Sequence, residues 1–393
     1  MNNFIYDLST KIYFGKGQIE NLPTEIKKHG TKVLFLYGKN SIKKIGLYDE
    51  AIKLLNENNI EFVELAGVDP NPRLSTVKEG SRLCRENNLD FILAIGGGST
   101  IDCAKAIAVD VFYEGDTWDD LYKFGKIDTI KKVLPVGSIL TLAATGSEMN
   151  RNTVISNEET EEKYGLGCDL LKPKFSILDP EYTFTVNEHH SMAGCSDILS
   201  HLMEQYLRPD INCDVSDRMN EGVMKVVLDN APKIKKNPND YIARANIMWA
   251  SSMALAGFQF MSGKKFGAFP VHSLGHELSS LYDMTHGITL ALVTPSWMRF
   301  NMKKAPQYIP MFARFARNVF GVLESDDEKA ASKGIEELEA FYKKIGMPKN
   351  MKDAGVEEDK LEYLASQATE FGDIGTMTSI NKDEALEIYK MAW

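Results

Sequence analysis

Four side chains in the sequence have the types and the spacing of a metal-binding site. Asp197 and His201 lie four positions apart, so on a helix both would project from one face toward a single point. His272 and His286 follow on a later segment and could supply two further imidazoles. One carboxylate and three imidazoles suit a divalent ion such as Fe(II) or Zn(II). An isolated aspartate or histidine in a helix is usually structural, so the prediction depends on all four acting together.

A glycine-rich motif, Gly96-Gly-Gly-Ser-Thr-Ile-Asp102, follows a β-rich run and precedes a helical pattern. In this arrangement the backbone N–H groups and the positive end of a helix can hold a pyrophosphate, and glycine lets the phosphate approach closely. The spacing differs from the usual GxGxxG fingerprint. A plain helix start, with Ser99 as N-cap and Asp102 three positions later, would need no ligand.

A second loop, residues 139–150, is rich in hydroxyl groups and also follows a β-rich run. It contains Thr141, Thr145 and Asn150. Loops at the carboxyl ends of parallel strands share one crevice, so both loops could line the same elongated ligand. The alternative is a surface turn with capping hydroxyls.

The elements that must position these residues change in kind along the chain. The first half alternates β-rich runs (32–38, 62–66, 91–95, 132–136 and 175–178) with helical patterns such as 47–58 and 75–88. This alternation predicts a parallel sheet covered by helices. Helical spacing dominates later, over residues 189–207, 214–231, 242–261 and 328–345. We therefore expect an α/β dinucleotide-binding domain over residues 1–182 and an all-helical metal-binding domain over residues 183–393.

Length and composition exclude several classes of protein. A chain of 393 residues fits two domains. The net charge of -10 opposes binding to nucleic acid. No apolar run is long enough to span a membrane, and the N-terminus lacks the pattern of an export signal, so a cytoplasmic location is expected. The five cysteines have no CxxC spacing and are expected to be reduced.

These motifs together resemble the iron-activated (group III) alcohol dehydrogenases. The resemblance rests on the glycine-serine loop with Asp102, on residues 145–148 (Thr-Gly-Ser-Glu), on the Asp197 and His201 pair and on the later histidines, in matching order over nearly the whole chain. Residues 37–44 and 144–150 are similar to the bacterial NADPH-dependent butanol dehydrogenases and broad aldehyde reductases. The resemblance implies a Rossmann-like N-terminal domain, an all-α C-terminal domain, a metal between them and a homodimer.

The resemblance also assigns roles to single residues. It implies that the metal ligands are Asp197, His201, His272 and His286, with Fe(II) favoured and Zn(II) as the alternative, and that His276 is a nearby non-ligand. The implied coenzyme-binding residues are Gly97, Gly98 and Ser99 at the pyrophosphate, Thr141 and Thr145 at the adenosine and phosphates, Asp102, Asn150 and Lys163 near the ribose or nicotinamide, and Leu178.

The end of the β-rich run over residues 32–38 bears on the choice of coenzyme. Enzymes that prefer NAD(H) commonly place a carboxylate there, where it accepts hydrogen bonds from the ribose 2′-OH. This run ends in Gly38, and Ser41 and several lysines follow without a competing acid. The segment therefore predicts NADP(H), although Lys43 and Lys44 could equally be a solvated helix face.

The expected reaction interconverts short- to medium-chain primary alcohols and aldehydes. A metal would polarise the carbonyl, NADPH would deliver the hydride, and His276 or Asp102 would act in catalysis, with His276 as a proton relay or only a packing residue. Chain length is expected to depend on residues such as Asn152, Phe258, Phe260 and Phe266. The alternatives are an enzyme like dehydroquinate synthase or glycerol dehydrogenase, a metal-dependent hydrolase, and a noncatalytic metal-binding protein.

Overall fold

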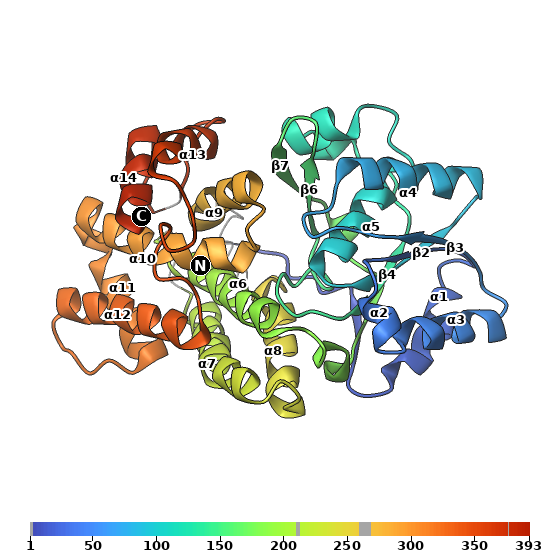
Figure 1. The fold of residues 1–393 in the computed structure, drawn as a ribbon, viewed down its shortest axis with the longest axis horizontal. Helices are drawn as coiled ribbons and strands as arrows, with labels where there is room; N and C mark the ends of the chain where they lie inside the picture. Colours follow the sequence, from blue (N-terminus) through green and yellow to red (C-terminus); the bar gives the residue numbers. More distant parts are fainter. Residues whose placement is uncertain (1–2, 210–212, 259–268, 376) are drawn as a thin grey trace. The chain divides into compact units, whose positions relative to one another are not determined.

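Two compact units make up the structure, a computed structural model that describes residues 3–209, 213–258, 269–375 and 377–393 (Figure 1). One unit spans Leu8–Val186, and the other combines Met1–Asp7 with Asn187–Trp393. The sequence places the division after residue 182 and assigns residues 1–7 to the first domain, so the two divisions differ. Asp179 gives a physical reason, because its carboxylate accepts hydrogen bonds from the backbone N–H groups of Gly17 and Glu181 and holds the 3-10 helix η5 (Pro180–Thr183) in the first unit.

The α/β unit is built on a six-stranded parallel sheet. In spatial order its strands are β1 (Lys11–Phe14), β8 (Phe175–Leu178), β5 (Val136–Leu140), β4 (Phe91–Gly96), β2 (Lys32–Tyr37) and β3 (Glu61–Ala66). The four inner strands are buried almost throughout, which explains why they are continuous apolar runs rather than alternating patterns. The predicted parallel sheet is confirmed.

Strand β5 lies further along the chain than the sequence prediction. The predicted run, residues 132–136, overlaps the strand only at Val136, because Pro135 has no N–H to give to the ladder. Within the strand, Gly137 leaves room for the rings of Phe91 and Phe175, which stack with their centroids 5.9 Å apart. A side chain at residue 137 would overlap both rings.

Helices cover both faces of this sheet (Figure 1). One face packs against three helices, α1 (Leu22–Ile26), α2 (Ser41–Lys44) and α3 (Leu47–Glu57). The other face packs against two longer helices, α4 (Leu74–Glu86) and α5 (Gly98–Asp110). An antiparallel pair that the sequence did not predict, β6 (Asn152–Asn157) and β7 (Glu162–Gly167), packs against α5. The remaining helical turns are η1 (Gln18–Asn21), η2 (Thr117–Lys123), η3 (Ile127–Thr129) and η4 (Asp169–Leu171).

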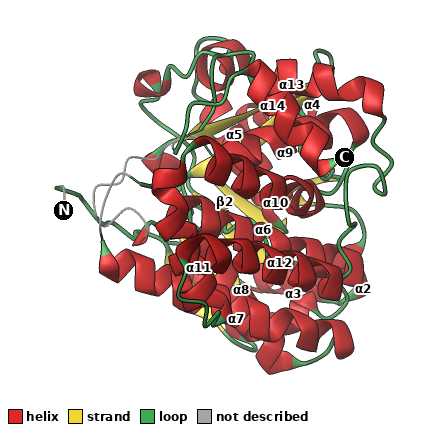
Figure 2. Cartoon of the chain, turned by 90° about the vertical axis from the view of Figure 1, so that its left-hand side faces the viewer, coloured by secondary structure: helices red, strands yellow, loops and turns green. Residues whose placement is uncertain are grey.

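The second unit is helical, as predicted. Its helices are α6 (Glu188–Tyr206), α7 (Asp214–Lys236), α8 (Tyr241–Ala254), α9 (Pro270–Tyr282), α10 (His286–Lys304), α11 (Ile309–Phe320), α12 (Asp327–Ile345), α13 (Leu361–Ala368) and α14 (Lys382–Ala392), with the short turns η7 (Pro306–Tyr308) and η8 (Glu358–Lys360). In Figure 2, α10 lies among α6, α9, α12 and α14, and it contacts all four. None of the helices in the described ranges is long and apolar enough to cross a membrane.

Two helix predictions differ from the structure at their ends. Helix α7 continues through Pro232 to Lys236, beyond the predicted end at residue 231. Helix α8 ends at Ala254, and the predicted segment 242–261 continues past it into residues outside the described ranges. Phe260 and Phe266, named for substrate chain length, also lie outside the described residues, whereas Phe258 is fully buried.

Candidate metal centre and coenzyme loops

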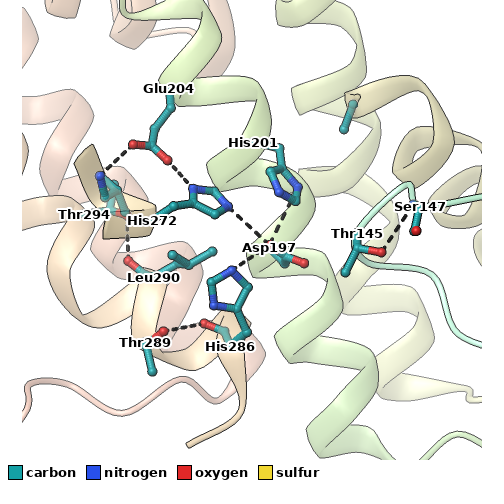
Figure 3. A network of polar contacts seen from close by, with 12 residues as sticks. Thr145, Ser147, Asp197, His201, Glu204, His272, His286, Thr289, Leu290 and Thr294 are labelled. Atoms are coloured by element: carbon teal, nitrogen blue, oxygen red, sulfur yellow. Dashed lines mark hydrogen bonds and ion pairs between the residues drawn. The ribbon is translucent and has the colours of Figure 1, made fainter. Parts of the chain in front are cut away.

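Three helices of the second unit bring the four predicted metal ligands together (Figure 3). Helix α6 presents Asp197 and His201 one turn apart, α9 presents His272, and α10 begins at His286. The Oδ1 atom of Asp197 lies 3.6 Å from His201 Nδ1, 3.8 Å from His272 Nε2 and 3.9 Å from His286 Nε2. Donor atoms of Asp197, His272 and His286 all lie within 4.8 Å of one another, and His201 adjoins this group through Asp197.

The connection from α9 to α10 places the last two histidines. Helix α9 ends at Tyr282, its C-cap Asp283 has the left-handed conformation with φ of 48°, and α10 starts at His286. Next to His286, Gly287 lies so close to α6 that a Cβ atom there would overlap the carbonyl group of Ala193. This close approach of the two helices sets His286 beside Asp197.

The donor set fits a divalent cation. Atoms bound at about 2.1 Å to one tetrahedral ion are about 3.4 Å apart, and the observed separations of 3.6–3.9 Å are close to this value and too long for hydrogen bonds. His201 Nδ1 and His272 Nε2 are buried and have no hydrogen-bond partner among the described residues. Burying polar atoms in this way is costly unless something binds them. A cation at the centre of the set would satisfy them.

Glu204 supports this site, and the sequence analysis missed it. It lies on α6 three residues after His201 and is buried. One carboxylate oxygen contacts His272 Nδ1, and the other accepts a hydrogen bond of 2.6 Å from the backbone N–H of Val271 (Figure 3). A proton held on Nδ1 leaves the Nε2 lone pair of His272 directed toward Asp197.

Burial and charge shift the imidazole pKa values in opposite directions. Burial lowers the pKa of His201 to about 4 against the opposing charge of Asp197, so this ring is neutral at neutral pH. Burial also acts to lower the pKa of His272, but the charge of Glu204, and then Asp197, raise it to about 9. Two carboxylates around one imidazole attract positive charge to this point, which is the charge that a divalent ion would supply.

His276 lies in the same group of rings. It follows His272 by one turn on α9, with ring centroids 6.1 Å apart, and its ring centroid is 4.9 Å from that of His286. It is less buried than His272. The structure therefore brings His276 to the predicted ligands, and its role as a proton relay stays a prediction.

The two predicted coenzyme loops are neighbours in the α/β unit. Helix α5 begins at Gly98 with Gly97 as N-cap and no side-chain cap, so the alternative with Ser99 as N-cap is wrong. The N–H of Thr141 donates to the carbonyl of Gly96 at 2.9 Å. A Cβ atom at Gly98 would overlap the side chain of Thr145. Glycine is therefore required where the second loop crosses the first turn of α5.

Asp102 and Lys163 contact other residues of the same unit. The carboxylate of Asp102 accepts hydrogen bonds from the Ser147 hydroxyl and from the backbone N–H of Val154, the latter at 3.0 Å. Burial raises the pKa of Asp102. Lys163, on β7, donates to the side-chain oxygen of Asn71 at 2.8 Å. Asp102 thus holds the second loop, and its predicted part in catalysis stays a prediction.

Asn150 and Leu178 also have internal contacts. The side-chain oxygen of Asn150 accepts a hydrogen bond of 2.8 Å from the N–H of Asn152, and its amide donates to the Thr145 carbonyl at 3.2 Å. Leu178 ends β8 with a fully buried side chain, and its carbonyl accepts the N–H of Gly15 at 2.9 Å. The structure gives Leu178 a place in the core of the sheet.

The strand end at Gly38 contains an acid that the sequence analysis did not consider. Lys39 forms an ion pair with Asp69, which follows β3, at 2.8 Å. The ammonium of Lys43 lies over the ring of Tyr48, 4.6 Å from its centroid. Ser41 is exposed as the first residue of α2. The statement that no acid competes here is therefore wrong, because β2 and β3 are adjacent in the sheet although Lys39 and Asp69 are thirty positions apart.

Comparisons with known proteins agree with this architecture. The family model for iron-containing alcohol dehydrogenases matches residues 9–180, and the model for the C-terminal part of the same family matches residues 191–393. The chain therefore belongs to the iron-containing alcohol dehydrogenase family.

Individual relatives match along their whole length. The chain is 45% identical to NADH-dependent butanol dehydrogenase A of Clostridium acetobutylicum and 34% identical to an NADPH-dependent aldehyde reductase of Escherichia coli, and each alignment covers 100% of both chains. The crystal structure of NADH-dependent butanol dehydrogenase A from Thermotoga maritima superposes with a TM-score of 0.93 at 38% identity, covering 100% of this chain and 99% of that chain.

Proposed function

We propose that this chain interconverts short- to medium-chain primary alcohols and aldehydes, with NADP(H) as coenzyme and Fe(II) as the favoured metal. The observation that carries the proposal is the group of three imidazoles around the Asp197 carboxylate in a chain of this family. The names of the relatives, butanol dehydrogenase and aldehyde reductase, support the substrate class. Family membership also favours an alcohol dehydrogenase over the alternatives of an enzyme like dehydroquinate synthase and a metal-dependent hydrolase.

The metal ion would be held by the predicted ligands and one supporting residue. Asp197, His201, His272 and His286 would hold the ion, and Glu204 would keep His272 in the tautomer that binds it. The bound ion would supply Lewis acidity that polarises the carbonyl oxygen and stabilises developing negative charge.

The coenzyme and the proton would be handled by other residues. The first-turn amides of α5, at Gly98 and Ser99, would hold the pyrophosphate of the coenzyme that donates the hydride. His276 would donate a proton to the alkoxide, since its ring lies beside that of His286.

Activity with added aldehyde tests the proposal directly. Freshly purified protein would be analysed for metal and assayed with straight-chain aldehydes from acetaldehyde to hexanal and both reduced coenzymes. We expect coenzyme oxidation that requires both the aldehyde and the metal. Metal-loaded protein that oxidises neither coenzyme with any aldehyde would refute the proposed activity. Light scattering during gel filtration tests the proposed homodimer.

The preference for NADP(H) is a separate part of the proposal. It is supported by Gly38, where a side chain is absent, and by the exposed Ser41. The carboxylate of Asp69 beside Lys39 opposes it, and two relatives with 45% and 43% identity are named as NADH-dependent. The ratio of kcat/KM for NADPH and NADH decides, and a clear preference for NADH would reject this part alone.

A further inference from the structure

The buried ammonium group of Lys105 has no part in the mechanism above. Lys105 lies on α5 and its side chain is fully buried. Its Nζ atom donates to the Ser147 hydroxyl at 2.9 Å, to the carbonyl and side-chain oxygens of Asn150 at 3.0 and 3.1 Å, and to the carbonyl of Asn152 at 2.8 Å. An ammonium has three donors, so all of them are used within one short segment.

That segment, residues 147–152, connects the second coenzyme loop to β6. Asp102, three residues before Lys105 on α5, holds the same segment through the Ser147 hydroxyl. Asp102 and Lys105, an acidic and a basic residue of α5, therefore both bind the hydroxyl group of Ser147. The N–H of Ser147 in turn donates to the Thr145 hydroxyl at 3.3 Å, and Thr145 lies against Gly98 in the first turn of α5.

Placing an ammonium in the interior is costly, so a specific requirement must retain it. Burial lowers the pKa of Lys105 to about 8, while the charges of Asp102 and Glu148 act in the opposite direction. A methionine would fill a similar volume but would leave the oxygens of Asn150 and Asn152 without this donor. The segment would then lose its main attachment to α5.

We propose that Lys105 is a positioning residue for the coenzyme. It fixes residues 147–152 on α5 so that Thr145 and the first-turn amides of α5 keep the arrangement that binds one ligand. This inference rests on the proposed function of these loops as the coenzyme site. It predicts a defect in coenzyme binding, with no defect in metal binding or in the maximal rate.

The test compares Lys105→Met with Lys78→Met in the full-length, metal-loaded protein. Lys78, on α4, forms an ion pair of 2.7 Å with Asp110 at the last residue of α5. Each change removes one lysine that has a contact at α5, but of the two only Lys105 contacts residues 147–152. The dissociation constants of NADPH and NADH would be measured by fluorescence titration, alongside kcat, the KM for coenzyme and the metal content.

For Lys105→Met we expect the dissociation constant and KM of the preferred coenzyme to rise by about tenfold, equal to about 1.4 kcal/mol. The kcat at saturating coenzyme and the metal content should be unchanged, and Lys78→Met should bind coenzyme like the wild type. Ser147→Ala removes only the shared hydroxyl and serves if Lys105→Met does not fold. It should weaken coenzyme binding in the same direction.

The outcomes separate the two proposals. If the wild type binds neither coenzyme, the proposed function fails. If the wild type binds coenzyme and Lys105→Met, or Ser147→Ala in its place, binds it equally well, the positioning role of Lys105 is refuted. Equal losses in Lys105→Met and Lys78→Met would also refute it, because they would indicate general destabilisation of α5.

Discussion

Replacing Glu204 by glutamine should weaken metal binding although Glu204 is not a predicted ligand. Glutamine keeps the shape of the side chain but offers one acceptor oxygen in place of two. If that oxygen accepts the N–H of Val271, the amide N–H₂ faces His272 Nδ1 and favours the tautomer whose proton points toward Asp197. If the glutamine amide is rotated by half a turn instead, its N–H₂ group faces the N–H of Val271, and two hydrogen-bond donors meet. Either arrangement disfavours the ligand form of His272.

Supporting partners of metal-bound histidines typically contribute 10- to 100-fold in affinity, so we expect a loss of about 1.4–2.7 kcal/mol. The loss of affinity is measured by letting the protein compete with a chelator of known affinity. Fe(II) is used under anaerobic conditions, and Zn(II) is measured as well. Glu221→Gln is the matched control. Glu221 is also buried in the helical unit, and it accepts hydrogen bonds from Tyr206 and Asn318 rather than from any of the four ligands. Unchanged affinity in Glu204→Gln would refute the reasoning.

Three further predictions concern the metal centre, the coenzyme loops and a buried carboxylate of the α/β unit. Asp197→Asn should lower metal affinity by at least about 100-fold, because it removes the buried charge at the centre of the ligand set. This factor is the upper end of the range for residues that only support a ligand. Full metal occupancy of the variant after equilibrium dialysis would contradict the prediction. Gly98→Ala should raise the dissociation constant of the coenzyme by about tenfold because its methyl group displaces Thr145, whereas Gly222→Ala, where a Cβ atom meets nothing within 4 Å, should not. Burial acts to raise the pKa of Glu25, but hydrogen bonds from Lys11, Lys28 and Tyr13 lower it to about 2, below its value in the unfolded chain. The ionised Glu25 side chain therefore stabilises the folded state above about pH 4.5, and this contribution is lost as the pH falls toward 2. The difference in free energy of unfolding between wild type and Glu25→Gln, about 1–2 kcal/mol at pH 6, should therefore narrow by pH 2.5 in urea titrations, and a constant difference would reject the assignment.

Local rules explain why two of the predicted ligands lie together, whereas the choice of all four came from the family resemblance. A helix repeats its face every three to four residues, which links Asp197 to His201, and the same rule applied three residues further would have found Glu204. Parallel strands end on one edge of the sheet, which correctly made neighbours of the loops at Gly98 and Thr145.

The errors arose where distant residues decide the structure. The predicted run for β5 stopped before Gly137, which belongs to the strand because the rings of Phe91 and Phe175 pack against it. No local pattern connects Lys39 with Asp69, because their contact depends on the pairing of β2 with β3. The pair β6 and β7 was also missed, because the left-handed residue in the turn between them, with a φ of 59°, is Glu161, a residue type that does not indicate this conformation.

Gly287 limits how this chain can be redesigned. Because the space at this residue is already filled by the backbone of α6 at Ala193, any larger amino acid would have to separate α10 from α6 and carry His286 away with it. A mutant library that diversified residue 287 to broaden the substrate range would therefore consist mainly of variants that no longer bind the metal ion. Engineers would do better to leave this position unchanged and vary side chains elsewhere.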